Sequence, residues 1–496
     1  MCGLQTLRVW QPPHARCAGA SPHSPRTTGY HVAAMELPAF LNAQFFISVL
    51  VILVVIHLLL GLAGGSIYLE RKISAYVQDR IGPNRVGFDL GLPLLKPLRG
   101  LFGMGQVLAD GIKMLLKEEY APKGVDKALF TIAPTIVVIP ALIGFAVIPW
   151  GGVIHFPDVI HFLGLTFNGG KVVVAGANIN VGIIYILAVA SLGVYGIVLA
   201  GWASNNKFAF LGSLRASAQM ISYEIPLGLS LLVALLMVGS LLPQDLIEYQ
   251  AHHGWLVLSQ PLAAAIVFIC FLAEANRTPF DNAECEQELV AGFHTEYSSM
   301  RYGMFPLSEY AHVAGGSAIF SMLFLGGYHL PLDLIGGDAG HVFSPENTAW
   351  YAALFKFGCF VTKTLLMIFL VIMVRWTIPR LRFDQVMQVA WQSVIPLALI
   401  NVVVVSVMVH LGDRYQDSIG LSLSSPLAMF LANIVVTVVA LGVLPLLPRR
   451  AGGWANERVR LAGSRFSPLA GEAVSTGPTL AFAREDRPRE GTAPSH

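Results

Sequence analysis

Seven carboxylates stand close together between residues 272 and 310 of an otherwise apolar chain. They are Glu274, Asp281, Glu284, Glu286, Glu288, Glu296 and Glu309, and two arginines, Arg277 and Arg301, accompany them. Acids at this density can carry protons or shape a polar binding site, although such a connector is also often a solvated loop. Helical spacing would place Asp281, Glu284 and Glu288 on one face. We therefore expect the segment to fold back against the protein and line a polar cavity.

Two further charged residues lie inside long apolar stretches. Glu224 comes about eight residues into the apolar segment 216–239, roughly 12 Å from its start at 1.5 Å per residue. A carboxylate at that depth is costly unless it is paired, hydrated or protonated, and we expect it to handle protons rather than to be a satisfied structural acid. Lys363 lies near the middle of segment 351–375, where it is a candidate partner for a buried carboxylate.

A third group of charged residues marks the end of the first apolar stretch. It comprises Glu70, Arg71, Lys72, Asp79, Arg80 and Arg85. An ordinary charged membrane boundary would explain part of it. The IGPNRVG turn that follows is stiffened by Pro83, because proline fixes φ. A rigid charged turn beside the acidic stretch can bind the polar head group of a ligand whose apolar tail enters the membrane.

Composition and absent motifs limit the class of protein. The chain has 496 residues, of which 55% are hydrophobic and 12% charged, whereas soluble domains carry about a quarter charged residues. This indicates an all-α polytopic membrane protein, and nothing points to a nucleic-acid partner. The five cysteines form no CxxC pair, and the sequence has no GxGxxG, P-loop or HExxH motif. We therefore expect no nucleotide, flavin, iron–sulfur or metal site, and any electrons must come from a partner.

Nine apolar segments are long enough to cross a hydrocarbon core of roughly 30 Å. They cover residues 45–67, 128–150, 179–202, 216–239, 255–274, 311–330, 351–375, 389–411 and 426–447. Alternate connectors, together with the tail and Arg375 at the edge of segment 351–375, hold 25 of the 32 Lys and Arg. By the positive-inside rule, the N-terminus lies outside and the acidic connector 275–310 lies on the cytoplasmic side.

The remaining stretches complete the expected organisation. Residues 1–34 lack the apolar core of a signal peptide and are expected to be a disordered extension or a start assigned too far upstream. The connector 68–127 mixes Leu, Met and Phe with charged residues at helical intervals, which predicts amphipathic helices along the cytoplasmic interface. Residues 412–447 form an additional membrane helix, and the polar tail 448–496 is expected to be disordered.

Four long motifs resemble one known family. ERKISAYVQDRIGPNRVG (70–87), GWASNNKFAFLGSLRASAQMISYEIPLGL (201–229), LAEANRTPFDNAECEQELVAGFHTEY (272–297) and RWTIPRLRFDQVMQVAW (375–391) are similar to the membrane-embedded H subunit of bacterial NADH:quinone oxidoreductase, the counterpart of chain 1 of mitochondrial complex I. The resemblance covers residues 35–411 as one membrane domain of eight helices. One departure is NAECEQ at 282–287, which sets Glu286 in a different frame from many relatives.

The resemblance implies a role in a proton-translocating complex of the bacterial inner membrane. Quinone would be the substrate, and NADH, FMN and the iron–sulfur clusters would belong to partner subunits of the peripheral and membrane arms. It implies a proton path or coupling role for Glu224, Asp281, Glu284, Glu286, Glu288 and Glu296, to which we add Lys363. It implies a quinone chamber that includes Glu70, Arg71, Arg80, Arg85, Arg277 and Phe293. The alternatives are the homologous protein of a membrane-bound hydrogenase and a stand-alone secondary transporter, although we find no inverted repeat.

Overall fold

The computed structural model describes residues 35–36, 42–88, 100, 102–162, 165–283, 286–330, 342–419 and 425–443. The chain divides into two units, residues 1–438 and 439–496. The described elements belong to the first unit, except the last residues of α15.

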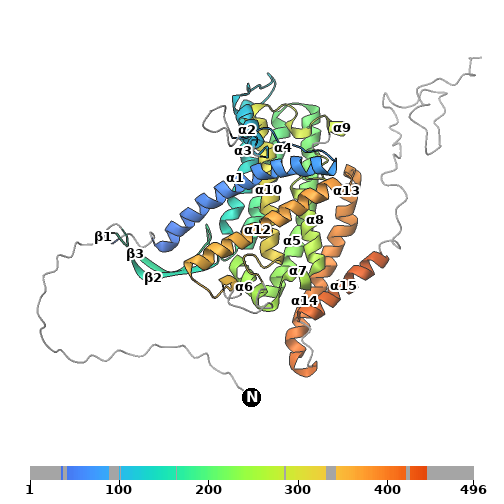
Figure 1. Cartoon of the computed structure of the whole chain (residues 1–496). Coiled ribbons are helices and arrows are strands. Elements are labelled where there is room, and N and C mark those ends of the chain that lie inside the picture. Colours follow the sequence, from blue (N-terminus) through green and yellow to red (C-terminus); the bar gives the residue numbers. More distant parts are fainter. Residues whose placement is uncertain are drawn as a thin grey trace, which may run out of the picture. The chain divides into compact units, whose positions relative to one another are not determined.

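Long helices make up most of the described part of the first unit (Figure 1). Among the described residues, six spans are long and apolar enough to cross a membrane. They are α1 (Ala43–Val77), α3 (Lys127–Ile143) with η2 (Gly144–Val147), α4 (Gly182–Ala203), α5 (Lys207–Val238), α12 (Trp350–Thr377), and the run of α13 (Phe383–Val389), η5 (Ala390–Val394) and α14 (Ile395–Ile419). The other three predicted segments coincide with α8 (Pro261–Glu274), α10 (Ser299–Phe324) and α15 (Pro426–Val443). The predicted fold class, a multi-pass helical membrane protein, is confirmed, while six of the nine predicted crossings meet this criterion.

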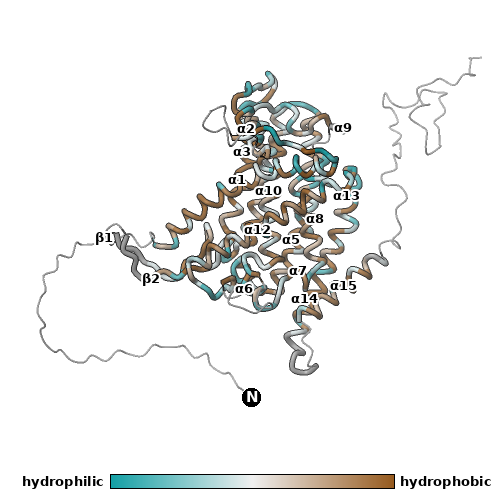
Figure 2. Tube along the Cα trace, viewed as in Figure 1, coloured by the Kyte–Doolittle hydropathy of each residue, from teal (hydrophilic) through white to brown (hydrophobic). Residues whose placement is uncertain are grey.

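Local sequence explains where several helices begin and end. The side chains of Asn42, Asp126 and Asn206 each accept a hydrogen bond from the first turn of the helix that follows, α1, α3 and α5 respectively. Gly239 ends α5 with φ of 74°, a conformation that glycine adopts without strain. The long helices are apolar along most of their length (Figure 2), and many of their large apolar side chains are exposed, as lipid requires of a membrane-spanning surface.

Short elements fill the connectors. The helix expected within 68–127 is present as α2 (Gly105–Leu116), which exposes Leu108, Ile112 and Leu115. An antiparallel hairpin, β2 (Val153–Phe162) and β3 (Leu165–Val173), with β1 (Met35–Glu36) parallel to β3, was not predicted. The remaining short helices are α6 (Pro243–His253), α7 (Leu256–Ser259), α9 (Glu286–Leu289) and η3 (Gly292–His294).

Small residues let the central helices pack closely. A Cβ on Gly315 of α10 would lie 2.8 Å from Phe145, and one on Gly316 would lie 3.2 Å from Phe271 of α8. A Cβ on Gly196 of α4 would overlap Val137 of α3. Apolar side chains gain little from associating in lipid, so close packing at such small residues holds membrane helices together. The same packing brings α3, α4, α8 and α10 around one central region.

The last helix also attaches to this bundle through a polar contact. The buried amide Nδ2 of Asn433 donates to Gln260 Oε1 at 2.7 Å and to Met429 O at 3.0 Å. Gln260 lies between α7 and α8, so the bond joins the ninth predicted segment to the fifth. A hydrogen bond of this kind is sheltered from water and helps to fix one helix against another.

Candidate functional site

Glu70, at the C-terminal end of α1, is the centre of a buried ionic cluster. Its Oε2 accepts a hydrogen bond from the hydroxyl of Tyr310 at 2.8 Å and lies 3.5 Å from Nη1 of Arg277. Its Oε1 forms an ion pair with Arg375 at the end of α12. The cluster therefore joins α1, α10, α12 and the loop after α8. We call the end of the bundle where these residues lie the charged end; Figure 1 shows α9 and α13 there, with α6 and α7 at the opposite end.

Arg277 connects Glu70 to a second acid. Its side chain is 9% exposed, its Nη2 lies 3.6 Å from Oε2 of Glu309, and its guanidinium stacks on Tyr310 with 3.9 Å to the ring centre. Burial alone would lower the pKa of Arg277, but Glu309 and Glu70 outweigh it and hold the pKa above its ordinary value. The arginine is thus permanently charged and fixes two carboxylates near each other.

Asp281 extends the charged end toward α13. Its Oδ2 accepts a hydrogen bond from Nη2 of Arg380 at 2.7 Å, and the nearby Leu381 N donates to Pro279 O at 3.1 Å. Burial raises the pKa of Asp281, and the neighbouring Arg380 opposes that rise without cancelling it. Asp281 is therefore an acid whose ionisation carries a desolvation cost although it has a partner.

The helical face expected for Asp281, Glu284 and Glu288 is not observed. Residues 281–283 are not helical, and α9 begins only at Glu286. Asp281 bonds Arg380, whereas Glu288 Oε2 bonds Nη1 of Arg215 on α5 at 2.6 Å. Asp281 and Glu288 are thus each bound by a different arginine, so helical spacing does not bring these two acids together. Glu284 and the side chain of Glu286 lie outside the described part of the chain.

Glu296 lies apart from the ionic cluster. Its Oε1 accepts a hydrogen bond at 2.6 Å from the amide of Asn206, the residue that caps α5. Glu288 and Glu296 therefore both bind the N-terminal part of α5. The predicted coupling acids thus fall into separate places, and the structure joins neither of these two to Glu70.

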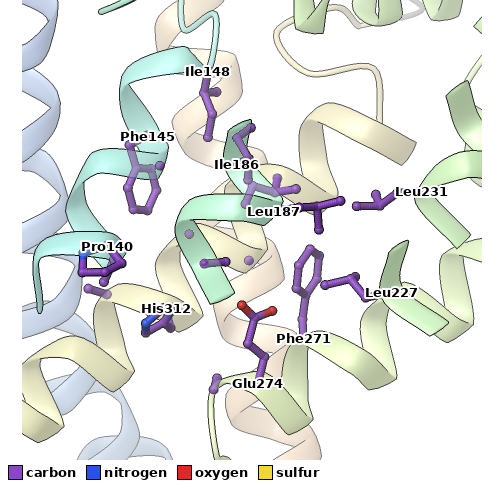
Figure 3. Close-up of a pocket in the computed structure, with 18 residues that line it drawn as sticks. Pro140, Phe145, Ile148, Ile186, Leu187, Leu227, Leu231, Phe271, Glu274 and His312 are labelled. Atoms are coloured by element: carbon purple, nitrogen blue, oxygen red, sulfur yellow. The ribbon is translucent and has the colours of Figure 1, made fainter. Parts of the chain in front are cut away.

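A cavity of about 50 Å³ lies beside Glu274, the last residue of α8 (Figure 3). Its walls are mostly apolar, and include Phe145, Leu227 and Phe271, but the Glu274 carboxylate and the His312 ring face into it. A cavity volume of about 10–15 Å³, measured in the same way, is enough to hold one water molecule. The cavity therefore has room for a few waters next to a carboxylate inside the bundle.

Two smaller cavities, of about 10 Å³ each, also touch Glu274. One is shared with Glu309 and His312 of α10. The other is shared with Glu224, whose carboxylate also has a hydrogen-bond partner in Ser191 of α4. Glu274 is the carboxylate common to all three cavities, so the cavities form a discontinuous route from Glu309 to Glu224.

Lys363 has a different partner from the one that we expected. Its Nζ donates to the carbonyls of Leu325, Gly327 and His329, at 2.6, 2.9 and 2.5 Å. These carbonyls lie at and beyond the C-terminal end of α10, where a positive charge is favoured. Backbone carbonyls, rather than a buried carboxylate, thus receive all three ammonium hydrogens. The contacts give Lys363 a capping role on α10.

The residues predicted for the quinone chamber also separate. Glu70 and Arg277 are buried in the ionic cluster, and Phe293 is 2% exposed and lines the small cavity with Glu274 and Glu309. Arg71, Arg80 and Arg85 are exposed, and Arg71 pairs with Asp110 of α2 at 2.6 Å.

Exposed apolar side chains stand beside these arginines. Val77, Ile81, Phe102 and Leu116 are 57%, 69%, 71% and 82% exposed. Highly exposed apolar side chains near arginines are typical of a site that binds a partner, a ligand or lipid.

Five residues of this region were missing from the predicted site: Glu274, Glu309, Tyr310, His312 and Arg375. Glu274 and Glu309 carried a usable signal, because each is an acid at the edge of an apolar segment. His312 follows Glu309 by three residues, which places both on one face of a helix. The partner of Tyr310 and Arg375 could not be read from the sequence, because both contact Glu70 at the end of the distant first helix.

The residues that the structure describes contain no group of three or more His, Cys, Asp or Glu side chains arranged to hold a metal ion.

Comparison with known proteins identifies the family. A family model described as NADH dehydrogenase matches residues 48–406. The NADH-quinone oxidoreductase H subunit numbered 1 in Cytophaga hutchinsonii is 41% identical over 373 residues, which cover 75% of this chain and 98% of the relative. The H subunit numbered 1 in Geobacter sulfurreducens is 43% identical over 363 residues, covering 73% and 94%. The H subunit of Leptospira biflexa is 42% identical over 341 residues, covering 68% and 88%. The chain therefore belongs to the family of NADH-quinone oxidoreductase H subunits.

Proposed function

We propose that this chain is the membrane subunit of an NADH:quinone oxidoreductase that couples quinone reduction to proton translocation. The observation that carries the proposal is the position of Glu274, which lines three cavities between the ionic cluster at the charged end and Glu224 inside the bundle. Buried carboxylates next to water-sized cavities are the usual means of moving protons through a membrane protein. A purely structural anchor would gain nothing from this arrangement.

The ionic cluster supplies the link to quinone chemistry. Reduction of a quinone to a quinol takes two electrons and two protons, so negative charge develops near the head group before protons arrive. The guanidinium of Arg277 lies 3.5 Å from a carboxylate oxygen of Glu70 and 3.6 Å from one of Glu309. A new negative charge beside this cluster would favour protonation of these acids. A proton taken up at Glu309 can then pass to Glu274 and onward to Glu224 through the waters that the cavities admit.

The quinone chamber is proposed for the exposed face around residues 77–88 and α2. Its arginines, Arg80 and Arg85, can bind the oxygens of the head group, while Ile81 and Phe102 contact the apolar tail. Partner subunits would cover this face and provide its remaining walls. FMN, the iron–sulfur clusters and the NADH site are assigned to those partners. The charged end would face the cytoplasm of a bacterium, because the connectors at that end are the basic ones.

The test is Glu274→Gln, which preserves size and hydrogen bonding but removes the titratable proton. In the assembled complex, we expect coupled proton pumping to fall at least about tenfold, since a proton-transferring side chain contributes about 10²–10⁴ in rate. Glu224→Gln should give the same defect. Oxidation of NADH by an artificial acceptor should be unchanged.

The matched control is Glu248→Gln on α6, which lies outside the three cavities and bonds Gln244 at 2.9 Å. Vesicles that carry each variant are compared for NADH oxidation, for quinone reduction and for proton uptake. Normal pumping by a fully assembled Glu274→Gln complex would overturn the proposed path.

A further inference from the structure

His312 is a second titratable group on the route between Glu309 and Glu274. It lies three residues after Glu309 on α10, so both side chains leave the same face of that helix. It lines the cavity of about 50 Å³ together with Glu274, and the smaller cavity together with both acids. In Figure 3 the His312 ring and the Glu274 carboxylate face the same space. No described acid other than Glu274 shares both of these cavities with it.

The elements packed around His312 leave few other groups that it can exchange protons with. From α3 the cavities receive Val137 and Pro140, and from α12 they receive Met367 and Val371. On the α4 side, a Cβ on Gly193 would lie 3.7 Å from Nε2, so the ring is close to the backbone of α4. His312 lines the cavity of about 50 Å³, the smaller cavity shared with Glu309, and a further cavity of about 20 Å³. Among the described lining residues, α3, α4 and α12 contribute no titratable side chain to these cavities.

The titratable groups that face this space therefore come from three helices. Glu274 is on α8, Glu309 is on α10 itself, and Glu224 of α5 lies in the next cavity beyond Glu274. Arg277 and Glu70 lie beyond Glu309 in the ionic cluster. His312 is the only imidazole among these described groups, and it lines one cavity together with two of the acids, Glu274 and Glu309.

We propose that His312 relays protons between Glu309 and Glu274, an inference that rests on the proton path proposed above. Protonated Glu309 gives its proton through a cavity water to one ring nitrogen of His312. The imidazolium then releases the proton on its other nitrogen, through water, to the Glu274 carboxylate. One O–H bond breaks at Glu309 and one forms at Glu274, no electron is transferred, and the ring ends neutral as its other tautomer. The relay thus replaces one transfer between the two acids with two steps through the ring.

A competing explanation is that His312 only fills space between α3, α4 and α8. The two roles differ in what His312→Gln should do. Glutamine keeps hydrogen bonding and approximate size but cannot hold a second proton near neutral pH. A relay predicts that coupled pumping falls about tenfold or more, and that its pH profile changes shape. A packing defect predicts lower assembly with a profile of unchanged shape.

The experiment compares the assembled complex in vesicles carrying wild type, His312→Gln, His57→Gln and Glu274→Gln. His57 is the matched control, because its ring lies on the exposed side of α1 and is hydrogen-bonded at 2.7 Å to Leu53 O. Assembly is measured on native gels, and proton uptake and quinone reduction are measured from about pH 5.5 to about pH 8.5, an interval of about one unit or more on each side of an ordinary histidine pKa. We expect His57→Gln to behave as wild type.

The outcomes separate the two proposals. A defect in both His312→Gln and Glu274→Gln, with an altered pH profile in the former, supports the relay. A defect in Glu274→Gln with normal pumping and an unchanged profile in His312→Gln leaves the path intact and overturns the relay. Normal pumping by Glu274→Gln overturns both. Loss of assembly in His312→Gln is resolved with His312→Asn, which is smaller and equally unable to relay; wild-type pumping by that variant also overturns the relay.

Discussion

Replacement of Arg277 tests whether the charged end is held by its ionic cluster. Arg277→Met keeps the apolar stem of the side chain but removes the charge between Glu70 and Glu309. Breaking a buried ion pair from one side typically costs about 3–5 kcal/mol. The two N–O distances, 3.5 and 3.6 Å, exceed those of strong charge-assisted hydrogen bonds, and Glu70 keeps Arg375 and Tyr310. We therefore expect the low end of that range, about 3 kcal/mol.

Two companion variants separate charge from shape. Arg277→Lys retains the charge but loses the planar stack on Tyr310, so it should cost about 1–2 kcal/mol. Glu309→Gln added to Arg277→Met removes an acid that has lost its arginine, so the double variant should be more stable than Arg277→Met alone.

Stability would be read by pulse proteolysis of the membrane-embedded complex across a urea series, with a tag on this chain. A loss below about 1 kcal/mol in Arg277→Met, the level typical of exposed pairs, would refute the argument. A double variant no more stable than the single one would show that charge imbalance is not the cause.

Two further predictions concern the acidic loop and the turn at residues 82–87. Because burial raises the folded pKa of Asp281 above an unfolded value of about 3.9, the folded protein binds more protons between the two values, and its stability falls as pH rises through that window. Relative to Asp281→Asn, wild type should therefore lose unfolding free energy from about pH 4 upward until the folded pKa is passed; a difference that is constant with pH in the same urea series would contradict this. Gly105→Ala would place a Cβ 2.6 Å from the carbonyl carbon of Gly87 and must displace the turn, so it should raise the KM for quinone several-fold. Gly111→Ala, in the same helix with open space around it, should not; equal KM values for the two variants would count against a quinone chamber at this turn.

The fold was largely predictable because lipid imposes a simple pattern. Each apolar run of membrane length became a helix, since an unpaired backbone group in hydrocarbon costs several kcal/mol. The sequence did not predict the β2–β3 hairpin, because apolar and polar residues do not alternate regularly along residues 151–178. Helix boundaries also moved: α5 begins at Lys207, well before the expected start at 216, because Asn206 caps it.

The candidate site was predictable in composition but not in arrangement. The order of residues alone places seven acids between residues 272 and 310, and it predicts that Glu224 faces the protein interior. It also determined the family, through long motifs with a particular order of charged residues. These are local properties, since they depend on which residues follow one another.

Which charges meet depends on the packing of the whole chain. Helical spacing grouped Asp281 with Glu288, but an arginine just before α13 and another on α5 bind them separately. Lys363 donates to backbone carbonyls and not to a carboxylate, because three carbonyl oxygens lie within reach at the end of α10. Glu274 and His312 gained their importance from cavities that form between helices distant in the sequence. Such contacts depend on how elements distant in the sequence pack together, and the residue pattern within one segment does not predict that packing.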